Sequence, residues 1–192
     1  MLDTLQICLW AITYVEIIYY GIKHYKERLT IMPLLAGSLN LAWEINALVL
    51  SNAFWGHILW LGLDVFIIAI NTYNLRRISS RILYCLMTVA FAVFLRQIFL
   101  VPHVDGVLIS VFAIDFIMAV DFLINARKIS LNGKILIAST KLLGDFFAWL
   151  TYANASLYVT VIGAIVFLIN LYYIAICLDE SAKNNKLKRV RR

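Results

Sequence analysis

The stretch GVLISVFAIDFIMAVDFLINARKIS, residues 106–130, decides the fold class of this chain. Its first part, residues 106–124, is predominantly apolar, and a basic segment that begins at Arg127 follows. About 20 apolar residues in a helix span the hydrocarbon core of a bilayer, and basic residues beside a span tend to stay in the cytoplasm. The stretch therefore predicts a transmembrane helix whose C-terminal end faces the cytoplasm.

Six further runs have the same character, so the sequence predicts an all-α, polytopic membrane protein with a bundle of seven transmembrane helices. The expected spans are 5–22, 31–51, 56–74, 82–101, 106–124, 135–153 and 157–178. The connections are short, so consecutive helices are expected to be antiparallel neighbours. The composition excludes a soluble domain, because 63% of the 192 residues are hydrophobic and only 15% are charged.

The net charge of +6 is distributed as a membrane topology signal and not as a nucleic-acid-binding surface. All Lys and Arg except Arg96 and Lys141 fall in four short segments, which are 23–28, 76–81, 127–134 and 183–192. The opposite connections contain no Lys or Arg. We therefore expect the N-terminus outside, one transmembrane domain over residues 1–182, and a basic cytoplasmic tail over 183–192. The host membrane would be the plasma membrane in a bacterium and the endoplasmic reticulum in a eukaryote.

Charged residues inside the apolar runs are the candidates for function, because each costs roughly 2.5–3.5 kcal/mol near the bilayer centre. Two of the carboxylates, Glu16 and Asp121, lie near cytoplasmic helix ends, and we expect them to be structural. The others are expected to fall in one slab of the outer half of the bundle, which contains Glu44, Asp64, Arg96, Asp115, Lys141 and Asp145. The slab predicts a buried pocket with more acids than bases, in which at least one carboxyl keeps its proton and can act as an acid.

Helical spacing predicts which side chains share a face in this slab. Lys141 and Asp145 are four residues apart and are expected to pair. The same spacing puts Asn40 on the face of Glu44, and Trp60 on the face of Asp64. We expect Asn40 to orient the Glu44 carboxyl through a hydrogen bond. Trp43, next to Glu44, lies too deep for an interfacial aromatic belt, so it either packs in the core or stabilises a cation through its ring face. No metal-binding or nucleotide-binding motif is present, and no cofactor is expected.

One segment, HYKERLTIMPLLAGSLNLAWEINALVL at residues 24–50, resembles the integral-membrane terpene cyclases of fungal and bacterial meroterpenoid and indole-diterpene pathways. The family pattern is a tyrosine with basic residues in the first cytoplasmic loop, then Met-Pro, then Asn-x-x-Trp-Glu in the second helix. Here these are Tyr25, Lys26, Arg28, Met32, Pro33, Asn40, Trp43 and Glu44. Weaker points of similarity are Leu63 with Asp64, Lys141 with Gly144, and Tyr173.

The resemblance implies that a buried acid protonates an epoxide or alkene of a prenyl chain and that the cation then closes rings until a base removes a proton. The motif glutamate, Glu44, takes the role of the acid. The family's second acid, in the seventh helix, falls on Asn170 in this chain, and asparagine cannot donate or accept the proton. Asp145 either takes over as the terminating base or only forms a structural pair with Lys141.

Two functions are therefore left open by the sequence. The first is a terpene cyclase acting on a lipophilic prenylated substrate taken from the bilayer, with Glu44, Asp64 and Asp145 as candidate catalytic residues. The second is a small carrier or proton-coupled transporter, because acids near the membrane midplane suit that function as well. The candidate cavity residues are Asn40, Trp43, Trp60, Arg96, Asp115, Lys141, Asn170 and Tyr173.

Overall fold

The computed structural model describes the backbone of residues 2–27, 30–50, 55–101, 105–126 and 134–190, and the side chains of these residues except residues 3 and 184–190. The described chain forms α-helices and short 3-10 helices without strands, so the all-α prediction is confirmed. The α-helices are α1 (Leu2–Lys23), α2 (Leu34–Leu50), α3 (Trp55–Asn74), α4 (Ile78–Phe99), α5 (Gly106–Asn125), α6 (Lys134–Tyr152) and α7 (Leu157–Val190). The 3-10 helices are η1 (Tyr25–Glu27) and η2 (Ala153–Ala155).

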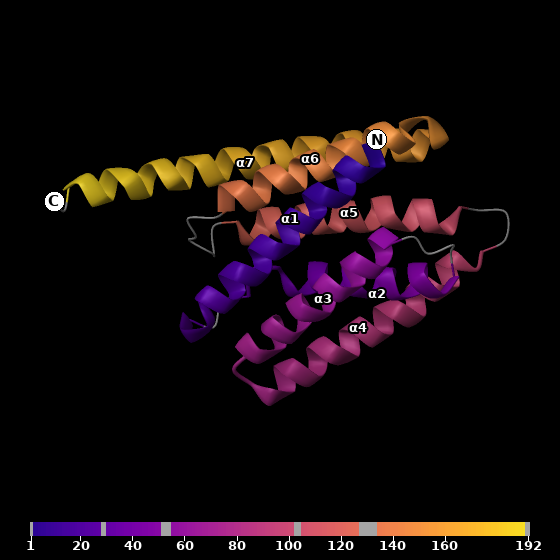
Figure 1. Ribbon diagram of the computed structural model, residues 1–192, viewed down its shortest axis with the longest axis horizontal. Helices are drawn as coiled ribbons and strands as arrows, with labels where there is room; N and C mark the ends of the chain where they lie inside the picture. Colours follow the sequence, from indigo (N-terminus) through magenta and orange to yellow (C-terminus); the bar gives the residue numbers. More distant parts are fainter. Residues whose placement is uncertain (1, 28–29, 51–54, 102–104, 127–133, 191–192) are drawn as a thin grey trace.

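Six of the helices form a closed ring, and the seventh lies outside it. Helix α1 packs against α3 and α6, α2 packs against α3 and α5, and α7 packs against α5 and α6. Helix α4 packs chiefly on the outer side of α2. Figure 1 shows α1 crossing the bundle diagonally and α7 extending beyond the other helices at its C-terminal end. The ring encloses the site described below.

Within the described residues, five helices are long and apolar enough to cross a membrane by length and composition. They are α1 from Thr4, α3, α4, α5, and α7 as far as Lys183. Helix α2 is apolar but has only 17 residues, and α6 is interrupted by Lys141 and Asp145. Large apolar side chains are exposed on the outside of the bundle, among them Leu83, Val89 and Val93 of α4, which is typical of a lipid-facing surface.

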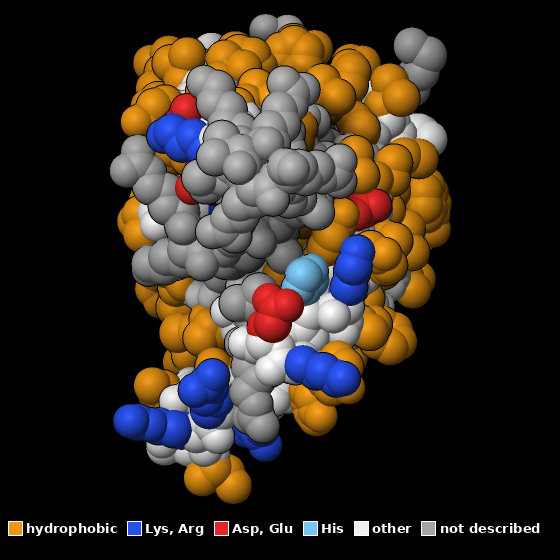
Figure 2. Space-filling view, turned by 90° about the vertical axis from the view of Figure 1, so that its left-hand side faces the viewer, with side chains coloured by type: hydrophobic (Ala, Val, Ile, Leu, Met, Phe, Trp, Pro, Cys, Tyr) orange, Lys and Arg blue, Asp and Glu red, His pale blue; other side chains and the backbone are white. Residues whose placement is uncertain are grey.

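Basic side chains gather at one end of the bundle. Lys23 ends α1, Lys26 lies in η1, Arg76 and Arg77 connect α3 to α4, and all four are exposed. Figure 2 looks at this end and shows Lys and Arg side chains over it, with hydrophobic side chains around the sides. This distribution is the one that the positive-inside rule associates with a cytoplasmic face.

The start of α2 shows why an apolar run and a helix differ in their bounds. The apolar run begins near residue 31, but the helix begins at Leu34, directly after Pro33. The Pro33 carbonyl accepts the Gly37 N–H at 3.0 Å. Asp121 of α5 accepts the Ala36 N–H at 3.0 Å and so satisfies one of the free donors of the first turn. This contact agrees with the structural role predicted for Asp121.

Candidate active site

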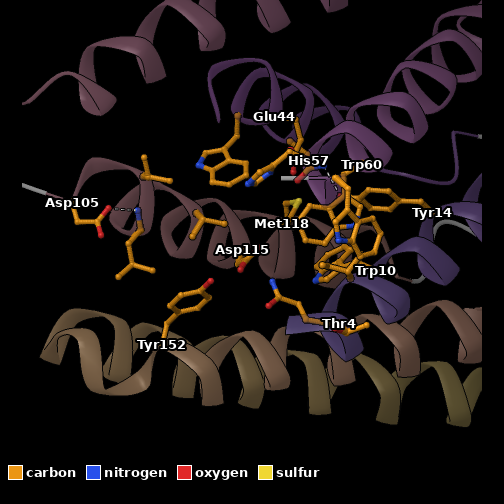
Figure 3. Close-up of a pocket in the computed structure, with 18 residues that line it drawn as sticks. Thr4, Trp10, Tyr14, Glu44, His57, Trp60, Asp105, Asp115, Met118 and Tyr152 are labelled. Atoms are coloured by element: carbon orange, nitrogen blue, oxygen red, sulfur yellow. Dashed lines mark hydrogen bonds and ion pairs between the residues drawn. The ribbon is translucent and has the colours of Figure 1, made fainter. Parts of the chain in front are cut away.

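A cavity of about 460 Å³ lies inside the ring of helices. It is lined by residues from α1, α2, α3 and α5, from the residue that caps α5, and from the end of α6, as Figure 3 shows. These residues are Thr4, Gln6, Ile7, Trp10, Tyr14, Asn40, Trp43, Glu44, Trp55, His57, Trp60, Asp105, Val107, Leu108, Val111, Asp115, Met118 and Tyr152. Its volume lies in the range of small-molecule sites in proteins.

The cavity has an exposed rim and a buried interior. The rim contains Trp55, which is 57% exposed, and Tyr152, which is 40% exposed. The interior contains Tyr14 and Glu44, each 3% exposed. The rim lies at the first turns of α1, α3 and α5, which is the end of the bundle opposite the basic side chains. The interior of the cavity is therefore buried and mainly apolar.

The carboxyl of Glu44 is held by a histidine. Its Oε2 lies 2.9 Å from Nδ1 of His57, which is in the first turn of α3. The His57 ring packs against Trp43 and Trp60, with ring centroids 5.4 and 5.8 Å apart. Sequence analysis did not identify His57. The available signal was the short connection between α2 and α3, because it brings the last turns of α2 and the first turn of α3 to the same depth.

Asn40 has different partners from those predicted. Its Nδ2 donates to the hydroxyl of Tyr14 at 2.5 Å and to Oδ2 of Asp64 at 2.7 Å. Both N–H groups of the amide are thus used, and the prediction that Asn40 orients Glu44 is wrong. The reason is that Asn40 lies one turn deeper on α2, where α1 and α3 supply nearer acceptors. Asp64 lies behind Asn40 and does not line the cavity.

The predicted tryptophans do line the cavity. Trp43 and Trp60 both contribute to its wall. Trp43 is fixed by a hydrogen bond of 3.0 Å from its Nε1 to Oγ of Ser110. Trp10 and Trp55 also face the cavity and were not predicted to do so. Four indole rings therefore surround a space that a carboxyl group, Glu44, also faces.

Lys141, Asp145 and Asn170 form a closed polar group, which we call the Lys141 cluster. Lys141 donates to Oδ2 of Asp145 at 2.6 Å and to Oδ1 of Asn170 at 3.3 Å. Asn170 donates to the same Asp145 oxygen at 2.6 Å. The predicted pair of Lys141 with Asp145 is thus confirmed. None of the three lines the cavity, so their placement matches the structural alternative for Asp145 and Asn170.

Trp10 separates the Lys141 cluster from the cavity. The Lys141 ammonium lies 5.2 Å from the centroid of the Trp10 ring. Gly144 allows this approach, because a Cβ atom built on it would lie 2.8 Å from Cδ1 of Trp10. The glycine of the Lys-x-x-Gly pattern is therefore required by the packing of α1 against α6.

Asp115 reaches the cavity wall from the middle of α5. It is 8% exposed. It interacts electrostatically with Asp145 and Lys141, but within the described residues it has no hydrogen bond or ion pair. The prediction that it lines a polar cavity agrees with this position.

Besides Lys141 and Asn170, two more of the predicted cavity residues lie outside the cavity lining. Arg96 is exposed on α4, outside the ring, and within the described chain it forms no ion pair with Asp64 or Asp115. The predicted counter-ion role is therefore wrong: Arg96 lies at the right depth, but on a peripheral helix. Tyr173 lines a separate small pocket near the start of α6, together with Pro33 and Lys134. It was placed in the cavity because of the family pattern, but it lies near the opposite end of the bundle.

Within the described residues, no group of three or more His, Cys, Asp or Glu side chains is arranged to hold a metal ion. Comparisons with protein-family models, curated proteins and solved structures gave no significant match to this chain.

Proposed function

We propose that this chain is a membrane-embedded terpene cyclase in which Glu44 protonates an epoxide or alkene of a lipophilic prenylated substrate. One observation carries the proposal. A carboxyl group that is 3% exposed faces a cavity of about 460 Å³ with four tryptophans in its walls and, among its described lining residues, no Lys or Arg. A buried acid beside aromatic faces is suited to start a cationic reaction and to stabilise its intermediates.

The proposed reaction is an isomerisation. The O–H bond of the Glu44 carboxyl breaks, and its proton goes to the epoxide oxygen or to an alkene carbon. The resulting carbon cation is attacked by the next double bond, which forms a ring and moves the charge along the chain. Loss of a proton to a base ends the sequence. Ring faces such as those of Trp43 and Trp60 stabilise the charge, and the mainly apolar walls exclude water that would trap it.

The motif resemblance supports the same assignment. Asn40, Trp43 and Glu44 of the Asn-x-x-Trp-Glu pattern all line the cavity. The departure is Asn170, which occupies the position of the second family acid and is hydrogen-bonded to Asp145. The proposal therefore assigns the initiating proton to Glu44 and takes neither Asn170 nor Asp145 as its source.

We also propose seven membrane crossings, with the N-terminus outside and the C-terminus in the cytoplasm of a bacterial plasma membrane or of an endoplasmic reticulum membrane. The basic end of the bundle supports this orientation, which puts the cavity rim at the outer side. Reporter fusions after residues 103 and 192 test it, because the first should report the outside and the second the cytoplasm. Both reporters on one side would exclude seven crossings.

The functional test uses membranes that contain the full chain and a panel of prenylated phenols with and without a terminal epoxide. Cyclisation by isomerisation gives a product of unchanged mass with fewer double bonds. In D₂O, protonation of an alkene adds one non-exchangeable deuterium on carbon, whereas opening of an epoxide leaves it on an exchangeable hydroxyl. Mass spectrometry distinguishes these outcomes.

Glu44→Gln should lower turnover at least about 100-fold, because it removes the transferable proton and keeps the shape. The matched control is Glu16→Gln, the same exchange at a half-buried glutamate outside the cavity lining, which should retain activity. Near-normal cyclisation by Glu44→Gln would exclude the assignment.

A small carrier or proton-coupled transporter is the alternative. The observation that favours it is a cavity with its exposed rim at one end of the bundle, as in one state of an alternating-access carrier. Uptake of prenylated phenols or protons into proteoliposomes, without chemical change of the solute, would support the carrier and exclude the cyclase.

A further inference from the structure

The buried carboxylates of the bundle differ in what they bind. Glu44 has His57, Asp64 has Asn40, and Asp145 has the Lys141 cluster. The half-buried Asp121 accepts the backbone N–H of Ala36. Asp115 is also buried, at 8% exposure, and within the described chain it is the carboxylate of this set without a hydrogen bond.

Asp115 is directed into the cavity, as Figure 3 shows. The nearby Lys141 does not neutralise it, because that ammonium already binds Asp145 at 2.6 Å, and the pair has no net charge. A buried carboxylate without a partner is costly. Its position at the cavity wall therefore indicates that the missing partner is a ligand.

The remaining walls determine the kind of partner. Trp10, Trp43 and Trp60 present rings to the cavity, and Met118 and Val111 add apolar surface. Aromatic faces around a carboxylate are the arrangement that binds organic ammonium ions. Small inorganic cations require several oxygen ligands instead, and the described residues hold no metal-binding group of three or more acids, histidines or cysteines.

We infer that the cavity binds a lipophilic organic monocation, a tertiary or quaternary ammonium compound, with Asp115 as its counter-charge and the indole rings around its alkyl groups. The site does not depend on the proposed reaction, because the ligand is a stable cation that undergoes no chemical change. In a cyclase such a compound would occupy the place of the carbon cation. In a carrier it would be cargo.

The test uses the full chain in nanodiscs of zwitterionic phosphatidylcholine, which avoids attraction of cations to an anionic surface. The probe is 4-phenylbutyltrimethylammonium, and the matched probe is its neutral isostere with carbon in place of nitrogen. Binding is measured by quenching of tryptophan fluorescence, with empty nanodiscs to correct for partition. The wild type should bind the cation at least about tenfold more tightly than the isostere.

Asp115→Asn should remove this preference and leave binding of the isostere unchanged. The control, Asp179→Asn, removes an exposed carboxylate of α7 that pairs with Lys183 and should behave as the wild type. Equal affinity of the wild type for the two probes would overturn the inference even if the Asp115 variant failed to fold. So would an unchanged preference in Asp115→Asn. The binding test measures no turnover. A negative result in the cyclisation assay would therefore leave this binding result valid, and a negative binding result would leave the cyclase proposal untouched.

Discussion

The cavity and the Lys141 cluster lie on opposite sides of the Trp10 ring. Both contain a buried aspartate, but the two aspartates differ in their partners. In the cluster, an ammonium and an amide both bind one carboxylate oxygen of Asp145, and the Lys141 side chain is fully buried. In the cavity, the Asp115 carboxylate faces open volume. The comparison teaches that burial of a charge does not mark a functional site. The feature that our inference uses is a buried charge for which the described residues supply no partner.

The largest effect should come from removing the cation of the cluster. Lys141→Met leaves Asp145 buried without its counter-charge, which costs about 3–5 kcal/mol. For a chain of this size we expect the apparent Tm in detergent to fall by roughly 10 °C or more. The double variant Lys141→Met with Asp145→Leu should recover most of the loss, because it removes both charges. A single variant as stable as the wild type would show that the pair does not hold the bundle.

A smaller loss of stability is expected when the acid of the cluster is removed, and part of it should be recovered when an acid is placed on the neighbouring helix. Asp145→Asn leaves the Lys141 ammonium with two neutral amides and should cost about 2–3 kcal/mol. Adding Asn170→Asp gives the cluster a new carboxylate, on α7 and within reach of Lys141, and should restore part of the stability. If Asp145 also served as the terminating base, the single variant would lose activity at a temperature at which it remains folded. Full activity of Asp145→Asn at that temperature would show that Asp145 has only a structural role.

The wall between the two regions can be tested at Gly144. A methyl group at this position would meet Trp10 at 2.8 Å from Cδ1, so α1 and α6 must separate or the indole must move. We expect Gly144→Ala to cost about 1–3 kcal/mol, and a tilt of Trp10 should change its fluorescence. Gly62→Ala is the control, because a Cβ atom there meets nothing within 4 Å. Equal losses in the two variants would contradict the assignment of Gly144 as a packing site.

The smallest effect on stability is expected at the cavity itself. Asp115→Asn breaks no described hydrogen bond or ion pair. The free energy of unfolding should therefore fall by no more than about 0.5 kcal/mol, or should rise. Arg96→Leu, on the exposed side of α4, should behave similarly. A loss as large as that of Lys141→Met in either variant would show that the charge has a structural partner.

The sequence predicted those features that depend on one helix. The apolar runs located the helices, and the spacing of Lys141 and Asp145 gave their pair, because both residues lie on one face of α6. It could not predict contacts that depend on the rotation of one helix against another. Asn40 and Glu44 share a face of α2, yet Asn40 binds Tyr14 of α1 and Asp64 of α3, while Glu44 binds His57.

The sequence also could not predict which helix lies outside the ring. Arg96 was assigned to the cavity from its depth alone, and depth does not distinguish a ring helix from a peripheral one. The tail also differed from the sequence pattern. Its polar residues indicate where the membrane span ends. They have helix propensities similar to those of the apolar residues before them, so the helix does not end with the span, and α7 continues to Val190.

The opposite placement of the two chain ends decides where a purification handle can be attached. Helix α7 has 34 residues, or about 51 Å at 1.5 Å per residue, which exceeds a hydrocarbon core of about 30 Å. An affinity tag joined behind it therefore begins well away from the bundle, at the end opposite the rim. One joined ahead of α1 begins at the mouth of the cavity, because Thr4 and Gln6 line it, and would compete with any ligand for entry.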